Sequence, residues 1–121
     1  MAQILLVDDD TNVLLTLAIA LRRQGHTVTV AQNGWQALSL LQREHFAFLI
    51  SDVKMPGMTG IELAQRAHEL PDAPLVILTS ALEVEIADGI VEHFMPKPVD
   101  VFQLHEVLLH DAHQFESKHA A

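Results

Sequence analysis

The feature that most limits the fold of this chain is a set of short apolar segments without polar alternation. They recur along the chain with longer stretches between them, and they are Ile4–Val7, Val28–Ala31, Phe46–Ile50, Leu75–Leu78 and Phe94–Met95. Strands that are buried on both faces of a parallel sheet have this composition, because neither face contacts water. The pattern therefore predicts five buried parallel strands.

The stretches between these segments carry hydrophobic residues at helical spacing, one apolar stripe in each. The stripes run from Val13 to Leu21, from Ala37 to Leu41, from Ile61 to Ala67 and, after Asp100, from Val101 to Leu108. Alternating strands and helices form a parallel sheet with helices on both faces. We therefore predict a single α/β domain over residues 1–121, with a doubly wound (βα)5 fold and a five-stranded parallel sheet.

Composition limits the partners of such a domain. The chain has 121 residues, half of them hydrophobic, and 7 Lys and Arg against 16 Asp and Glu give a net charge of −9. That charge repels nucleic-acid phosphates and anionic membranes. The absence of cysteine excludes disulfides and thiolate metal sites. No signal peptide or membrane-length apolar run is present, so we expect a cytoplasmic protein that binds neither nucleic acid nor membrane directly.

Three carboxylates, Asp8, Asp9 and Asp10, follow the first predicted strand directly. Two unit charges about 4 Å apart repel by roughly 4 kcal/mol at a protein surface. One acid can cap the helix that follows, but capping needs only one. Three together indicate a hard cation with oxygen ligands, Mg²⁺ or Ca²⁺.

Polar residues also follow the other central strands. Asp52 comes after the third predicted strand, Thr79 and Ser80 after the fourth, and Lys97 after the fifth. Open parallel sheets bind ligands at this edge, near the point where the strand order reverses. Acids hold a metal, a carboxylate accepts phosphate, and a hydroxyl and an ammonium bind its oxygens. The combination predicts phosphoryl transfer.

Four motifs, in this order and each behind a buried strand, resemble the receiver domain of two-component response regulators, a flavodoxin-like domain. They are ILLVDDD, LISDVKMPGMTGIEL, VILTSA and FMPKPVD, and the resemblance covers nearly the whole chain. It implies a phosphoacceptor switch in phosphorelay signal transduction. A sensor histidine kinase or phosphotransfer protein would donate the phosphoryl group, and the switch would control a downstream protein. The resemblance implies no enzyme activity beyond self-phosphorylation and self-dephosphorylation.

The resemblance also assigns the acidic residues. Asp52 matches the phosphoacceptor. Asp8 and Asp9 match the pair that binds Mg²⁺, with Mn²⁺ as an alternative ion, together with Asp52 and the backbone carbonyl of Lys54. Asp10 is then a helix cap or an acid outside the metal ligands. The divalent ion would offset the repulsion among these carboxylates, and we expect strain without it.

Three further residues match the switching parts of the family. Thr79 matches the hydroxyl that turns toward the phosphoryl group, and Lys97 matches the lysine that pairs with its oxygens. The peptide bond before Pro98 is expected to be cis, as in the family. Phe94 matches the aromatic switch position, with simple core filling as the alternative role.

One departure from the family concerns the fourth helix. Thr79 and Lys97 are 97 − 79 = 18 positions apart, about one helical turn less than is usual in the family. We therefore predict a shortened fourth helix before Gly89. The face that the family builds from its fourth helix, fifth strand and fifth helix would be altered.

A rival interpretation is an enzyme, a Mg²⁺-dependent phosphatase of the haloacid-dehalogenase type. That class uses an Asp nucleophile with a second Asp two residues on, as Asp8 and Asp10 are placed, but Asn12 stands where it requires Thr or Val. The covalent phosphate would sit on Asp8 in the phosphatase and on Asp52 in a receiver.

Two residue types stay outside these assignments. Trp35 is expected on the second helix, either as a partner contact or, as we prefer, partly buried against its own helix. His105, His110 and His113 fall on the last helix, and the spacing of His110 and His113 can ligate a metal. A solvated helix face is the preferred interpretation for these histidines.

Overall fold

The computed structural model describes residues 2–82 and 89–118, and for residues 112–118 it describes the backbone alone. The described part forms one sheet of five parallel strands in the order β2-β1-β3-β4-β5. The strands are β1 (Gln3–Val7), β2 (Thr27–Ala31), β3 (Phe48–Asp52), β4 (Leu75–Ser80) and β5 (His93–Pro96). All four pairings are parallel, which confirms the predicted sheet.

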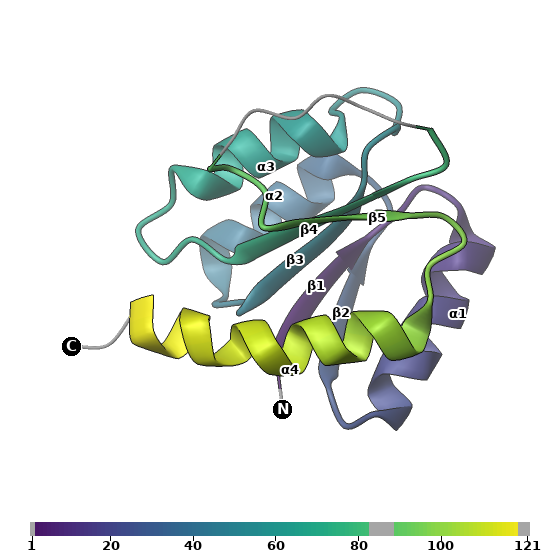
Figure 1. Ribbon diagram of the computed structural model, residues 1–121. Helices are drawn as coiled ribbons and strands as arrows, with labels where there is room; N and C mark the ends of the chain where they lie inside the picture. Colours follow the sequence, from purple (N-terminus) through teal and green to yellow (C-terminus); the bar gives the residue numbers. More distant parts are fainter. Residues whose placement is uncertain (1, 83–88, 119–121) are drawn as a thin grey trace.

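Helices cover both faces of the sheet (Figure 1). The helices are α1 (Thr11–Arg23), α2 (Gly34–Arg43), α3 (Gly60–His68) and α4 (Val101–Lys118). One core cluster joins α1 and α4 to one face through Leu14, Leu104 and Leu108. The other joins α2 and α3 to the opposite face through Leu41 and Leu63. The doubly wound α/β prediction is therefore confirmed.

The helices begin where the sequence supplies caps. The Asp10 side chain accepts the N–H groups of Asn12 and Val13 at the start of α1, and Asn33 caps α2 in the same way. Thr59 and Glu62 form a reciprocal capping box at the start of α3. These contacts satisfy N–H groups that have no partner inside the helix. They therefore fix the residue at which the loops before α1 and α3, both close to the candidate site, end and the helices begin.

The third strand lies two residues later than predicted, at Phe48–Asp52 instead of Phe46–Ile50. Phe46 is buried, but it belongs to the core cluster beside Leu41 before the strand begins. The apolar Phe46 was therefore counted as part of the predicted strand, although it lies before the first residue of β3. Asp52 is consequently the last residue of β3 and not a residue beyond it.

The connection from β4 to β5 spans residues 81–92. The predicted short fourth helix falls mainly on residues 83–88, which lie outside the described residues. The flanking residues 81–82 and 89–92 are not helical, and the helix labelled α4 is the last helix of the predicted pattern. No helix in the described part of the chain is long and apolar enough to span a membrane.

Candidate functional site

The candidate site lies at the carboxyl ends of the central strands, where the strand order reverses between β1 and β3. Asp8 follows β1 directly, and Asp52 ends β3. Thr79 lies at the end of β4, and Lys97 follows β5. The parallel register therefore brings residues from four segments of the sequence to one edge of the sheet.

Three carboxylates converge at this edge. One oxygen each from Asp8, Asp9 and Asp52 lies within 4.8 Å of the other two. Asp8 and Asp52 are buried, while Asp9 is exposed. Carboxylate oxygens at this separation form a donor set that suits a hard divalent cation, so the residues present fit such an ion.

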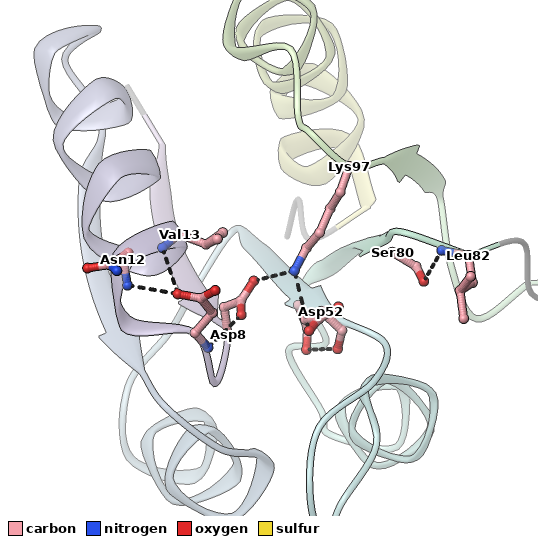
Figure 2. Close-up of polar contacts among 9 residues, drawn as sticks. Asp8, Asn12, Val13, Asp52, Ser80, Leu82 and Lys97 are labelled. Carbon is pink, nitrogen blue, oxygen red and sulfur yellow. Dashed lines mark hydrogen bonds and ion pairs between the residues drawn. The ribbon is translucent and has the colours of Figure 1, made fainter.

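Lys97 reaches between the two buried carboxylates (Figure 2). Its Nζ lies 2.8 Å from Asp8 Oδ2 and 3.4 Å from Asp52 Oδ2. The other oxygen of Asp8 accepts the backbone N–H of Asp10 at 2.9 Å. The ammonium thus offsets part of the repulsion between these two carboxylates.

The backbone holds Lys97 in place as well. Its N–H donates to the carbonyl of Ser80 at 2.9 Å, and the Lys97–Pro98 peptide is cis, as predicted. On the neighbouring strand, the N–H of Val53 donates to the carbonyl of Thr79 at 2.9 Å. The ends of β3, β4 and β5 are therefore tied together beside the carboxylates.

Burial and charge shift the ionisation of the two central groups. Burial raises the pKa of Asp52, and the charge of Asp8 adds to the rise, while Lys97 and the backbone N–H of Lys54 oppose it. Burial alone would lower the pKa of Lys97, but hydrogen bonding and charge from Asp8 and Asp52 raise it above its usual value. Lys97 is therefore held as a cation at the site.

The polar residues around Asp52 differ in their surroundings. Lys54 is exposed, and its backbone N–H acts to lower the pKa of Asp52. Thr79 is buried at the end of β4. Ser80 accepts the N–H of Leu82 at 3.1 Å, which fixes the start of the β4–β5 connection (Figure 2). Thr79, which pairs with Asp52 in the sheet, is therefore the buried hydroxyl residue that β4 places beside this carboxylate.

Ser51 is a neighbour of the site to which the sequence assigned no role. Its buried hydroxyl donates to the carbonyl of Asp52 at 2.9 Å. The bond fixes the last peptide of β3. A serine next to an aspartate is common in sequences, so the pattern alone carried no signal for this role.

Phe94 lies away from the carboxylates. The next residue of β5, Met95, packs in the cluster with α1 and α4. Because successive side chains of a strand alternate between faces, Phe94 points to the opposite face, and it is 37% exposed. The structure therefore does not bring Phe94 together with Asp8, Asp52 and Lys97.

The fold and the site together define a doubly wound α/β domain with converging acids, a buried hydroxyl residue and a lysine at its switch point, and this set of groups fits a divalent cation. A sequence model of the response regulator receiver domain matches residues 4–109. The chain belongs to this family, as predicted.

Individual relatives agree with this assignment. The response regulator receiver protein CpdR of Brucella abortus is 41% identical over 87 residues, which are 71% of this chain and 72% of CpdR. A CheY-like receiver domain protein of Methanospirillum hungatei superposes with a TM-score of 0.86 at 25% identity, covering 98% of both chains. The Thermotoga maritima response regulator TrrA, solved with Mg²⁺ and BeF, gives a TM-score of 0.82 at 26% identity, covering 91% of this chain and 98% of TrrA.

Proposed function

We propose that this chain is a phosphoacceptor switch in which Asp52 receives a phosphoryl group from the phosphohistidine of a histidine kinase or phosphotransfer protein. The observation that carries the proposal is the position of Asp52, a buried carboxylate at the end of β3 that lies 3.4 Å from the ammonium of Lys97. Residues 1–121 would act as a single receiver domain, and the phosphorylated form would control a downstream protein by changing its own conformation.

The transfer is a substitution at phosphorus. A carboxylate oxygen of Asp52 forms the new bond to phosphorus, the bond from phosphorus to the donor nitrogen breaks, and the imidazole leaves. Lys97 neutralises charge on the phosphoryl oxygens, for which it must turn away from Asp8. The hydroxyl of Thr79 would then bind a phosphoryl oxygen, which links phosphorylation to the end of β4.

Mg²⁺ is the proposed cofactor, with Mn²⁺ as an alternative. Asp8, Asp9 and Asp52 would hold it with their carboxylates, and Lys54 with its backbone carbonyl. When bound, the ion neutralises the negative charge that carboxylate and phosphoryl group bring together. The convergence of three carboxylate oxygens within 4.8 Å supports this assignment.

The proposed roles of Thr79 and Phe94 concern the switch. The buried position of Thr79 at the end of β4 supports its role as the hydroxyl that reads the phosphoryl group. The half-exposed position of Phe94 on β5 leaves it room to change its packing when Thr79 moves. Such a two-state change is how a local charge on Asp52 would alter a distant surface.

Phosphotransfer from radiolabelled phosphohistidine donors tests the proposal. A panel of histidine kinases from the same genome should contain at least one that labels this chain rapidly in Mg²⁺. Asp52→Asn should remain unlabelled by the same donor, while Asp10→Asn, a change to the α1 cap, should be labelled. Equal labelling of Asp52→Asn would exclude Asp52 as the acceptor.

A further inference from the structure

Trp35 is the single tryptophan of the chain, which has no tyrosine, and it lies in the first turn of α2. The residue is 58% exposed, but two neighbours lie close to it. The guanidinium carbon of Arg66, on α3, lies 5.5 Å from the centre of its ring. The indole Nε1 lies 3.6 Å from the place that a Cβ on Gly57 would take. Trp35 therefore lies beside α3 and the loop after β3, and it is exposed, whereas a partly buried position was preferred from the sequence.

The loop of residues 53–59 connects Asp52 to α3, and it is closed at its base. The N–H of Gly60 donates to the carbonyl of Val53 at 2.8 Å. A Cβ on Gly60 would lie 2.1 Å from the carbonyl oxygen of Asp52, so only glycine allows this approach. The base of the loop is consequently held directly against the proposed phosphoacceptor.

The far side of the loop rests on α2. Met55 and Met58 are buried in the cluster under α2 and α3, whereas Gly57 is exposed at the tip with a φ of 78°. A Cβ on Gly34 would lie 2.7 Å from Cβ of Met58, so the first residue of α2 contacts Met58 closely. Trp35, the next residue of α2, lies beside Gly57. Two successive residues of α2 thus meet two successive residues of the loop.

We propose that Trp35 is a positioning residue for this loop and, through it, for the proposed metal ligand Lys54, three residues before Gly57. The indole lies beside the tip of the loop, and the guanidinium of Arg66 lies over the indole ring. A loop fixed at base and tip presents the Lys54 peptide to Asp52 in one position. This inference rests on the proposed function, because it concerns how the same site is organised.

The arrangement also couples the site to the surface of α2 and α3. Any displacement of the loop on cation binding changes the packing of the indole on Gly57. Because the chain has one tryptophan, its fluorescence reports that packing without interference from another indole or a tyrosine. Binding at the carboxylates should therefore be visible at Trp35.

A Mg²⁺ titration followed by tryptophan fluorescence and by calorimetry tests the inference. The wild-type emission should change and saturate with the dissociation constant that calorimetry gives. Trp35→Ala should bind Mg²⁺ about tenfold more weakly, the lower end of the cost for residues that orient metal ligands. Trp35→Phe, which keeps a ring over Gly57, should stay within about twofold of wild type. Ile19→Ala, which removes a similarly exposed apolar side chain from α1, should bind like wild type.

The outcomes separate this inference from the proposed function. If the wild type binds Mg²⁺ and Trp35→Ala binds it equally well, the positioning role is wrong while the acceptor role of Asp52 stands. A lower melting temperature of Trp35→Ala with unchanged Mg²⁺ affinity would likewise assign Trp35 to stability alone and overturn the inference. If no Mg²⁺ binds to the wild type, both proposals fail.

Discussion

The ammonium of Lys97 lies 2.8 Å from the carboxylate of Asp8, a residue 89 positions earlier in the chain. The contact places a positive charge among the converging acids, so Lys97 acts as an internal cation there. The same Lys97 is the proposed partner of the phosphoryl oxygens. In the proposed function, the metal and the phosphoryl group would therefore use the same carboxylates that Lys97 contacts, Asp8 and Asp52.

The first prediction concerns the removal of this internal cation. In chelator, Lys97→Met should lower the free energy of unfolding by about 1–3 kcal/mol, because it leaves the buried Asp8 and Asp52 without their cation. Mg²⁺ should raise the melting temperature of this variant more than that of the wild type, since the ion then replaces the missing charge. Thermal melts with and without Mg²⁺ measure both effects. A variant as stable as wild type in chelator would show that the ion pair contributes nothing.

The second prediction compares two of the acids. Among the described residues Asp9 has no ion pair, whereas Asp8 binds Lys97 and the N–H of Asp10. Asp9→Asn should therefore raise the melting temperature in chelator by about 2 °C, through lost repulsion alone. Asp8→Asn should give a smaller gain, because it also weakens the contact with Lys97. Both should weaken Mg²⁺ binding in calorimetry, and unchanged affinity in either variant would remove that acid from the proposed ligand set.

The third prediction concerns acid. Buried His26 accepts the N–H of Ala2 through Nδ1, and its Nε2 lies 3.0 Å from Nδ1 of His105 on α4. Since Nδ1 accepts, the proton of neutral His26 is on Nε2, which donates to His105. A second proton on either ring would disrupt this chain of bonds. Burial, followed by the charge of His105, lowers the pKa of His26.

The sign of the pH effect follows from that shift. Below about pH 6.5, the usual value for histidine, the unfolded chain binds a proton at His26 more readily than the folded chain does. Stability should therefore fall as the pH drops from 7.5 to 5.5. Denaturant unfolding at both pH values should show a smaller fall in His26→Gln, while His68→Gln, at an exposed site on α3, should resemble wild type. Equal falls in all three proteins would rule out this linkage.

The fourth prediction concerns the attachment of α4 to the edge strand β5. His93 Nε2 lies 2.5 Å from Asp111 Oδ2, and the Asp111 side chain is 4% exposed. His93→Leu should destabilise the protein by about 2 kcal/mol, because a buried carboxylate loses its partner. The double variant His93→Leu/Asp111→Leu should recover much of that loss. A double-mutant cycle in urea measures the coupling, and strictly additive effects would show that the pair is not coupled.

The sheet was predictable because strands buried on both faces are apolar along their whole length. This pattern can be recognised in each strand by itself, without knowledge of contacts with distant parts of the chain. The candidate site followed from it, since Asp8, Asp52, Thr79 and Lys97 each end or follow such a strand. The limits of β3 were misplaced, because Phe46 is buried without pairing, and burial and strand pairing are separate properties.

The contacts that fix the site could not be predicted in the same way. The motifs place Lys97 and Asp8 at the same edge of the sheet. They do not specify that the Lys97 ammonium pairs with Asp8 in the space that a cation would take. His105 was expected on a solvated face, yet it is half-buried against His26, 79 residues away. No local periodicity reports a contact between two segments so distant in the chain.

The central claim is that Asp52 is the residue that takes up the phosphoryl group with the help of a divalent ion. The most direct test is intact-mass measurement after incubation with acetyl phosphate and Mg²⁺, with chelator, Asp52→Asn and Asp8→Asn as the comparisons. We predict one acid-stable, base-labile phosphoryl group on the wild type and none on Asp52→Asn or in chelator. A phosphoryl group of the same lability on Asp52→Asn, lost instead in Asp8→Asn, would contradict the account and favour the phosphatase with Asp8 as nucleophile.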